Sequence, residues 1–509
     1  MKKTVIILML LTMFSKVLGF IRDIALSFFY GASTVSDVYL ISLTIPTVIF
    51  AIIGKGISTG FIPMYTRIEG SDGTKKAHQY TNNVVNLVLV ICTFIFIAGL
   101  NYTEPLVKLF ASGFRGDTLE LAIDFTRISL AGVYFTGVIY VLTAFLQIKE
   151  VFIISALMGL PSNFIVIGSF YLSSETNIYI LSFGSVLAIA SQFILLSFYG
   201  YKKNYRYRPR LEIHDKNLRN MVVLALPAIL GSSIAQINLL IDRTLASHIA
   251  VGGISALNYA NTINLVVLGV AVSSITSVLY PKISKMAAAH DMKEMKKYLA
   301  TGVSAINIIV LPATVGYMIF AEPIVQLLFG RGEFNQQAVS LTANALFYYS
   351  IGMIGLSLQM ILSNAFYSLQ DTKTPMVNSS ICLLLNIVLN LILSRYMGIG
   401  GLALATSISA VFCSVLLFVS LRKRVGDFGG EAMLLSFIKI LVASLIMGVS
   451  SRSAFELLLN FYSQTNSLFV SVFLGGVMYF VLISFMKIKE VNIVLHEMQN
   501  RIYKRKKAS

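Results

Sequence analysis

Long apolar stretches recur along the whole chain and are separated by short polar connections. Each has about the 20 residues that an α-helix needs to cross a bilayer, and none shows the alternating pattern of membrane-spanning strands. The stretches lie near residues 4–30, 35–66, 80–101, 122–147, 151–172, 177–200, 218–247, 254–281, 298–320, 339–367, 375–396, 399–421, 432–450 and 466–486. The pattern predicts an all-α polytopic membrane protein with about 14 transmembrane helices.

The basic residues are spread unevenly over the connections, and this indicates how the helices are oriented. One alternating set of connections holds few of them, namely Lys108, Arg115, Arg331, Arg395 and Arg452. The other set and the two ends of the chain hold most of the 40 lysines and arginines, chiefly within 67–79, 201–219, 282–297 and 422–424. Because cytoplasmic connections are enriched in Lys and Arg, both termini are predicted to be cytoplasmic.

An internal repeat divides the chain. Glu104-Pro105-Leu106-Val107-Lys108-Leu109 recurs as Glu322-Pro323-Ile324-Val325-Gln326-Leu327, and Pro63 pairs with Pro281 at the same spacing. Since six helices per repeat is an even number, the two halves insert with the same orientation. The sequence therefore predicts one six-helix lobe over 1–217, a repeated lobe over 218–424, and two extra transmembrane helices with a basic cytoplasmic tail over 425–509.

Composition supports lipid as the solvent of this chain. It is 56% hydrophobic and 12% charged, with a mean hydropathy of +0.78, whereas a soluble domain has about 25% charged residues. The net charge of +17 is explained by the cytoplasmic connections, so no nucleic-acid partner is expected. Cys92, Cys382 and Cys413 lie inside apolar stretches and predict neither a disulfide framework nor a metal cluster.

Charged residues inside the predicted helices are the first candidates for function, because each costs about 2.5–3.5 kcal/mol at a helix centre unless it has a partner or a wet cavity. They are Lys16, Arg22, Asp23, Asp37, Lys55, Asp124, Arg127, Asp242, Arg243 and Lys439. One interpretation makes them structural ion pairs or residues near an interface, and this is favoured for Arg127 and Lys439.

A second interpretation applies to Lys16 and Arg22 in the first helix and Lys55 in the second. These cations outnumber the nearby Asp23 and Asp37, and a cavity with surplus positive charge suits an anionic substrate. Lysine and arginine both bind phosphate, arginine in a bidentate fork, and glycines flanking Lys55 would let backbone approach a ligand. A phosphate-binding cavity is therefore a second hypothesis.

Polar residues in later helices offer oxygen atoms to a cation. Asn386 and Asn390 are four residues apart on one helix face, with Asp242 and Thr406 in other helices. Hard cations take oxygen ligands, which makes a sodium site one hypothesis. The alternative, favoured by the residues alone, is that these groups form hydrogen bonds between helices, contributing about 0.6 kcal/mol each.

Catalytic signatures are missing from the sequence. It contains no P-loop, since Gly54-Lys55-Gly56 lacks the upstream glycine and the hydroxyl residue, and no His-Glu-x-x-His or Gly-x-Ser-x-Gly motif. The predicted connections are also too short for an extramembrane catalytic domain. The sequence predicts a transporter and not an enzyme, with no cofactor apart from a coupling ion such as sodium.

Specific motifs are distributed over essentially the whole chain. They are Ser15-Lys16-Val17-Leu18-Gly19-Phe20-Ile21-Arg22-Asp23, Gly31-Ala32, Ser36-Asp37-Val38-Tyr39, Leu226-Pro227-Ala228-Ile229-Leu230-Gly231, Ala256-Leu257-Asn258-Tyr259-Ala260, Ala365-Phe366-Tyr367-Ser368-Leu369-Gln370-Asp371-Thr372-Lys373-Thr374-Pro375 and Gly401-Leu402-Ala403-Leu404-Ala405-Thr406-Ser407. These segments resemble the MurJ (MviN) lipid II flippase family.

The resemblance implies the fold of the multidrug/oligosaccharidyl-lipid/polysaccharide (MOP) exporters, with two six-helix lobes around a V-shaped central cavity and two C-terminal helices that form a lipid-facing groove. It implies a bacterial cytoplasmic-membrane flippase that moves lipid II, an undecaprenyl-diphosphate-linked peptidoglycan precursor, to the outer leaflet by alternating access. The expected partners are this lipid-linked precursor, membrane lipids and the cell-wall synthesis machinery.

The resemblance also implies which residues bind substrate. Arg22, Asp23 and Asp37 match cavity residues of the family, and Lys16 stands where the family usually has arginine. The chain departs from the family where Thr44, Phe50 and Lys55 replace a lysine, an arginine and a glutamate, and where Thr262 replaces an arginine. Lys55 and Arg243 are expected to compensate for the lost cations.

The family's sodium site would fall on Asp242, Asn386, Asn390, the Leu402 carbonyl and Thr406. Asn390 replaces a carboxylate present in some members, and the loss of that negative charge is expected to weaken cation binding.

Three alternatives to lipid II transport stay open on the sequence. Phe50 and Thr262 favour another polyprenyl-diphosphate-linked saccharide, such as a teichoic, capsular or O-antigen unit, as the cargo. A MATE-like cation or drug antiporter of the same superfamily would need an acidic cavity, against which Lys16 and Arg22 argue. A non-transporting scaffold of a cell-wall synthesis complex is the third.

Overall fold

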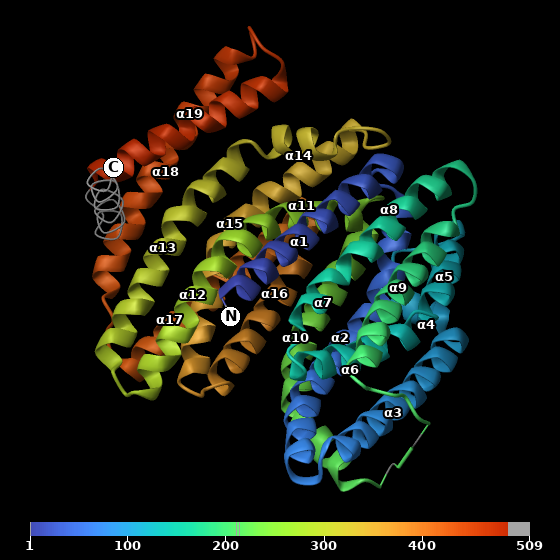
Figure 1. Cartoon of the computed structure of the whole chain (residues 1–509). Helices are drawn as coiled ribbons and strands as arrows, with labels where there is room; N and C mark the ends of the chain where they lie inside the picture. The colour runs from blue at the N-terminus through green and yellow to red at the C-terminus, as the bar shows by residue number, and fades with distance from the viewer. Residues whose placement is uncertain (1, 210, 213, 487–509) are drawn as a thin grey trace, which may run out of the picture. The chain divides into compact units, whose positions relative to one another are not determined.

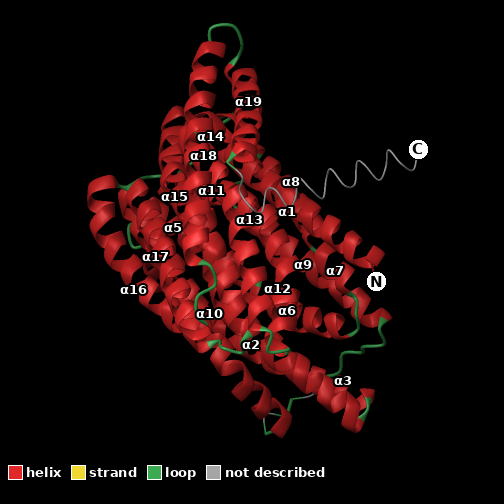
Figure 2. Cartoon of the chain, turned by 90° about the vertical axis from the view of Figure 1, so that its left-hand side faces the viewer, coloured by secondary structure: helices red, strands yellow, loops and turns green. Residues whose placement is uncertain are grey.

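The structure, a computed structural model, describes residues 2–209, 211–212 and 214–486. Helices and the loops that join them make up this described part, and it contains no strand (Figure 2). The helices in order are α1 (Lys2–Tyr30), α2 (Thr34–Asp72), α3 (Thr74–Asn101), α4 (Thr103–Phe110), α5 (Asp117–Leu130), α6 (Val133–Ile148), α7 (Phe152–Leu157), α8 (Gly159–Glu175), α9 (Ile180–Lys202), α10 (Lys216–Ile249), α11 (Gly253–Val267), the π-helix η1 (Leu268–Val272), α12 (Ser273–Ala288), α13 (Met292–Ile319), α14 (Ala321–Phe329), α15 (Gln336–Ser368), α16 (Lys373–Met397), α17 (Ile399–Val425), α18 (Gly430–Leu458) and α19 (Gln464–Phe485).

The all-α polytopic fold class is confirmed. Within the described residues, 11 helices are long and apolar enough to cross a membrane, or up to 12 if the bent pair α5 and α6 is one span. The count of 14 is not confirmed. The two remaining predicted stretches, 4–30 and 218–247, coincide with α1 and α10, which are helices of 29 and 34 residues but are not among those 12.

The chain forms two compact units. The first comprises residues 1–255 and 331–338, and the second comprises residues 256–330 and 339–509. The first unit therefore includes α10, which the repeat alone would assign to the second lobe. This follows from tight packing of α10 on α2, where a Cβ at Gly60 would lie 2.6 Å from the Met221 carbonyl oxygen. The predicted basic tail after residue 486 lies outside the described residues.

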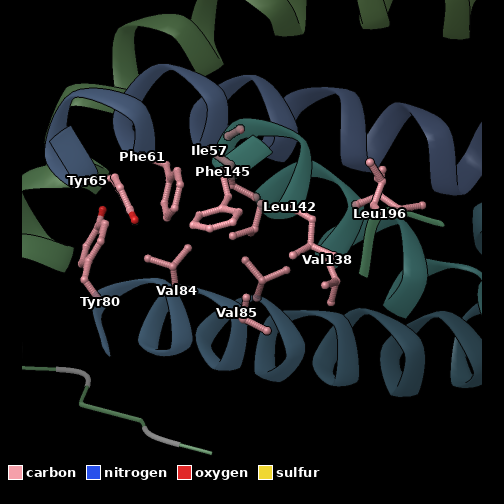
Figure 3. Close-up of a cluster of buried hydrophobic side chains, with 14 of the residues drawn as sticks. Ile57, Phe61, Tyr65, Tyr80, Val84, Val85, Val138, Leu142, Phe145 and Leu196 are labelled. Atoms are coloured by element: carbon pink, nitrogen blue, oxygen red, sulfur yellow. The ribbon is translucent and has the colours of Figure 1, made fainter. Parts of the chain in front are cut away.

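Aromatic side chains fill the core of the first unit between α2, α3 and α6 (Figure 3). Phe61 stacks on Tyr80 with ring centroids 5.6 Å apart, and Tyr65 meets Phe145 edge-on at 5.7 Å. In lipid there is little hydrophobic gain from bringing apolar helices together, so close packing must hold them. Large rings of this kind supply such contacts and fix α2 against its neighbours.

The second unit is built on close contacts between backbones. A Cβ at Gly355 of α15 would lie 2.5 Å from the Val411 nitrogen of α17, so only a glycine permits this approach. The helices α18 and α19 pack side by side (Figure 1), and α18 also packs on α13. The Tyr479 hydroxyl of α19 donates to the Ile308 carbonyl of α13 at 2.7 Å. The two C-terminal helices are thus attached to the unit by both packing and a hydrogen bond.

The sequence repeat has a counterpart in the helix boundaries. The helix α3 ends in a break at Tyr102 (φ −114°, ψ 30°) before α4, and α13 ends in a break at Phe320 (φ −108°, ψ 23°) before α14. The repeated Glu-Pro motif lies in α4 and α14, where proline occupies the first turn, a position that needs no backbone donor. The motif therefore encodes where a long helix breaks and restarts.

We expect Gly355→Ala to lower the free energy of unfolding by about 1–3 kcal/mol, because the added methyl group meets backbone that cannot move aside. Gly316→Ala in α13 is the matched control, since a Cβ there meets nothing within 4 Å, and it should be neutral or stabilising by up to about 1 kcal/mol. Thermal unfolding of the detergent-solubilised protein measures both. Equal melting temperatures for the two variants would contradict the described α15–α17 contact.

Candidate functional site

Arg22 and Asp23 form an ion pair within α1. The Asp23 Oδ1 atom accepts from Arg22 Nη2 at 2.9 Å and from Nε at 3.2 Å. The Arg22 side chain is 41% exposed, whereas that of Asp23 is 12% exposed. Because the carboxylate occupies only two of the guanidinium nitrogens, Arg22 keeps donors for an anion. Its cost inside the membrane is nevertheless reduced by a partner in the same helix.

The three predicted cations lie at different depths along the helices. Arg22 and Lys16 precede the end of α1 at Tyr30 by about 12 and 21 Å, and Lys55 follows the start of α2 by about 32 Å, at 1.5 Å per residue. Lys16 and Lys55 are exposed. Moreover, α1 packs mainly on α8 and α7, whereas α2 packs on α10, α5 and α6. The structure therefore does not gather the three cations into one cluster.

The glycines beside Lys55 serve helix packing. A Cβ at Gly54 would overlap the ring of Tyr140 in α6, and a Cβ at Gly56 would lie 2.8 Å from Ile229 in α10. Both glycines are buried, so helices and not a ligand occupy the space above them. The prediction that they let backbone approach a phosphate group is therefore wrong. They let α2 pack closely between α6 and α10.

Asp37 has a structural partner in the first unit. Its Oδ1 atom accepts from the backbone nitrogen of Ser255 at 2.7 Å and from the Ser255 hydroxyl at 2.8 Å, and its side chain is buried. Ser255 lies in the first turn of α11, where backbone N–H groups have no partner within the helix. Asp37 thus caps the start of α11 from another helix, with a negative charge where the helix dipole favours one.

The turn between α1 and α2 is packed tightly within the first unit. Gly31 adopts φ +63°, and a Cβ there would overlap the carbonyl oxygen of Glu333. The Glu333 backbone nitrogen donates to the Phe28 carbonyl at 2.9 Å. Gly252, at φ +76°, likewise leaves no room for a Cβ beside Ala32. The Gly31-Ala32 and Ser36-Asp37 motifs therefore fix this turn.

Thr44, Phe50 and Thr262 stand where the resemblance places basic residues, and each has its contacts within the protein. The Thr44 hydroxyl donates to the Leu40 carbonyl at 2.6 Å, and the Thr262 hydroxyl donates to the Asn258 carbonyl at 2.8 Å. Phe50 is 1% exposed and belongs to the core of the first unit. None of these three residues supplies a cation.

The predicted sodium ligands are only partly brought together. In the second unit, Asn390 Nδ2 donates to Asn386 Oδ1 at 2.8 Å, and Asn386 Nδ2 donates to Thr406 Oγ1 at 3.4 Å. Leu402 is fully buried on the same helix as Thr406. Asp242 and Arg243 are half-buried in α10 of the first unit. The cluster in the second unit offers neutral oxygen atoms, which fit Na⁺.

Two other intramembrane cations have structural partners, as favoured from the sequence. Arg127 lies 3.9 Å from Asp124 one turn earlier in α5, and both side chains are about half exposed (53% and 44%). Lys439 of α18 donates to the Met486 carbonyl at 3.3 Å, at the C-terminal end of α19. A cation is favoured at that end of a helix, where carbonyl groups lack partners.

The long motif that contains Asp371 has a structural role in the second unit. Asp371 accepts from the Thr374 backbone nitrogen at 3.0 Å and from its hydroxyl at 2.7 Å, and it also pairs with Arg424 at the end of α17. Burial raises the pKa of Asp371, but the Thr374 hydrogen bonds and the Arg424 charge outweigh it and hold the pKa below its usual value. The motif thus caps α16 and ties it to α17.

Sequence reasoning missed the residues that complete these contacts, above all Ser255. A signal for it was present, since Ser255 lies 218 residues after Asp37, the spacing of the repeat. Ser112 and His248 were also missed; their side chains bond at 2.7 Å between the connection after α4 and the end of α10. No motif marks that pair.

Solved structures show which fold this chain has. The chain matches a structure described as "Inward-facing conformation of a multidrug resistance MATE family transporter of the MOP superfamily" with a TM-score of 0.71, at 15% identity over 84% of this chain and 99% of that one. A structure described as "Lipid II flippase MurJ, inward closed conformation" matches with a TM-score of 0.82, at 24% identity over 94% of this chain and 98% of that one. The fold is that of the MOP exporters.

The sequence comparison identifies the family. The sequence pattern of the family described as "Lipid II flippase MurJ" matches residues 26–486. A "Probable lipid II flippase MurJ" of Vibrio cholerae is 29% identical, covering 82% of each chain. A "Lipid II flippase MurJ" of Burkholderia cenocepacia is 27% identical, covering 86% of each chain. The chain belongs to the lipid II flippase MurJ family.

We expect Asp37→Ala to lower the melting temperature of the purified protein, because it leaves the Ser255 backbone donor buried without an acceptor at a cost of about 1–3 kcal/mol. Ser255→Ala should cost less, since it removes only the hydroxyl. The exposed Asp72→Ala on the same helix is the control. A double-mutant cycle should show Asp37 coupled to the Ser255 hydroxyl, and strict additivity would show that this hydroxyl contributes nothing. An Asp37→Ala melting temperature equal to that of the unchanged protein would show the same for the backbone hydrogen bond.

Proposed function

We propose that this chain is a flippase that carries lipid II, a polyprenyl-diphosphate-linked peptidoglycan precursor, across the bacterial cytoplasmic membrane. Membership of the MurJ family over residues 26–486 supports the cargo. The observation that carries the proposal within the molecule is Arg22, a cation in α1, which the sequence predicts to span the membrane; its carboxylate partner is next to it and its side chain is 41% exposed. The protein acts as a transporter and not as an enzyme.

The chemistry of Arg22 suits a diphosphate. A guanidinium offers planar, paired N–H donors that match two phosphate oxygens, and such charge-assisted hydrogen bonds are about twice as strong as neutral ones. Asp23 holds Nε and Nη2, which fixes the orientation of the remaining donors. Because the pair lies within one helix, it persists when other helices move. Arg22 can therefore hold the headgroup through an alternating-access cycle.

The depths of the cations support stepwise movement of the headgroup. Counted along the helix axes from the turn between α1 and α2, Arg22, Lys16 and Lys55 follow one another at intervals of about 10 Å, at 1.5 Å per helical residue. With cytoplasmic termini, as the basic connections predict, Lys55 is nearest the cytoplasm and Arg22 is nearest the outside. The diphosphate would meet Lys55 first and Arg22 last. Enzymes of cell-wall synthesis would supply and consume the cargo.

The membrane potential would favour export. A diphosphate with about two negative charges gains roughly 4–5 kcal/mol when it leaves a negative interior across 100 mV. Sodium entry, through the polar cluster of Asn386, Asn390 and Thr406, would then return the carrier to its inward-facing state. The neutral amide at residue 390 would weaken sodium binding at this cluster.

We expect Arg22→Ala to abolish the ability of this chain to support growth of a bacterium depleted of its own lipid II flippase. Lys293→Ala, an exposed lysine at the start of α13, should support growth like the unchanged protein. Growth and outer-leaflet lipid II, measured with an externally added probe, are compared at equal membrane levels of each variant. Equal function of the two variants would overturn the role of Arg22.

The same experiment tests the cargo. Failure of the well-inserted, unchanged protein to rescue growth would favour another polyprenyl-diphosphate-linked saccharide as the substrate. The headgroup of that saccharide would not need the cations that Phe50 and Thr262 replace. Rescue that is lost in Arg22→Ala shows instead that lipid II is carried without those cations.

We expect lipid II flipping in proteoliposomes to fall when external sodium is replaced by choline. Asn390→Ala should reduce this dependence, because it removes one oxygen of the polar cluster. Asn261→Ala, an exposed amide in α11, is the control. A flipping rate that is identical in sodium and choline would rule out sodium coupling and leave the membrane potential as the driving force.

A further inference from the structure

A cavity lies in the first unit, on helices that carry neither Arg22 nor Asp37. It has a volume of about 450 Å³ and is enclosed by α3, α6 and α9, within the size range of sites for small ligands. Its wall is apolar, with Val85 and Leu89 from α3, Val138 and Leu142 from α6, and Phe193 from α9. Such a surface suits a hydrocarbon chain.

The mouth of this cavity is built from polar aromatic residues at the end of α9 and the connection that follows. Tyr201, Tyr205, Arg206 and Tyr207 line it. The Arg206 guanidinium stacks on the Tyr201 ring at 3.3 Å and donates to the Tyr201 carbonyl at 2.8 Å. The Tyr207 hydroxyl donates to Asn86 Oδ1 at 2.6 Å. Arg206 is therefore held in place beside the opening and is exposed.

The surroundings of the mouth carry surplus positive charge. Lys202, Lys203, Arg206 and Arg208 are all exposed, and within the described residues none of the four forms an ion pair with a carboxylate. Lys202 lies over the ring of Phe198 with its Nζ atom 4.6 Å from the centroid. These cations stand where a spanning helix ends, which is the level of the lipid headgroups, and on the side predicted to be cytoplasmic.

The cavity is apolar, and it opens at headgroup level beside cations that form no ion pair within the described residues. A molecule with a hydrocarbon chain at one end and a negative charge at the other would fit both features. We propose that this cavity binds an anionic phospholipid of the membrane, with one acyl chain between α3, α6 and α9 and its phosphate group at Arg206 and Lys202. A cationic amphiphile would be repelled by the same residues. A zwitterionic lipid would fill the cavity but would gain less from the charges. This inference does not depend on the flippase activity.

The absence of tryptophan from the chain allows a direct test. Phe193→Trp places a single fluorophore at the cavity wall, and Phe94→Trp places one on the exposed face of α3, where Phe94 is 74% exposed. Each full-length variant is reconstituted in nanodiscs that contain either phosphatidylglycerol or phosphatidylcholine with brominated acyl chains, which quench a neighbouring tryptophan. The bulk concentration of bromine is the same in both.

We expect phosphatidylglycerol to quench Phe193→Trp at least about twofold more than phosphatidylcholine does, and to quench Phe94→Trp equally. Adding Lys202→Gln and Arg206→Gln should remove the preference, since each basic residue contributes about fivefold to association with an anionic lipid. Equal quenching of Phe193→Trp by both lipids would show a crevice filled by any lipid and would overturn the proposal. Absence of quenching by either lipid would overturn it as well.

A second measurement avoids a new residue at Phe193. Val138→Phe fills the cavity from α6, and native mass spectrometry of this variant should show at least about twofold less retained phosphatidylglycerol than the unchanged protein. Val90→Phe, an exposed change on α3, is the control. Equal retention by Val138→Phe and the unchanged protein, with both folded by thermal unfolding, would contradict the proposed site.

Discussion

Arg22 and Asp23 are neighbours in the chain, and the proposed binding of an anionic headgroup depends on the ion pair between them. A cation inside a membrane needs a partner or water. Here the 2.9 Å contact lies within α1. It therefore lowers the cost of keeping Arg22 in the membrane without tying α1 to any helix that must move. The guanidinium remains 41% exposed and available to an anion.

The same requirement, that polar groups in lipid be satisfied, explains most other charges and motifs. Asp37 caps α11 through Ser255, Asp371 caps α16 and binds Arg424, and Lys439 binds the last carbonyl of α19. These residues fix helix ends, and helix ends must be fixed if lobes are to move as rigid bodies. Several of the motifs that resemble the family therefore fix the ends of helices.

The sequence predicted the helical class and most of the spans, because apolar length determines them locally. It showed the repeat of the Glu-Pro motif, but the helix breaks before α4 and α14 became clear only from the structure. It could not predict that Gly54 and Gly56 are packing residues, because that depends on Tyr140 and Ile229, which are distant in the chain. The place of α10 in the first unit is likewise a tertiary contact. Lys55 was expected beside Arg22, but helix geometry places it about 20 Å deeper.

The proposal that Arg22 binds the lipid headgroup is tested most directly by the affinity of the purified protein for lipid II. This affinity is compared with that for a lipid of the same chain and saccharide that lacks the diphosphate. Arg22→Ala should weaken lipid II binding about tenfold to a hundredfold, since hydrogen bonds to charged groups contribute about 1.5–3 kcal/mol. It should leave the uncharged analogue almost unaffected. If Arg22→Ala binds lipid II as tightly as the unchanged protein, Arg22 does not hold the headgroup.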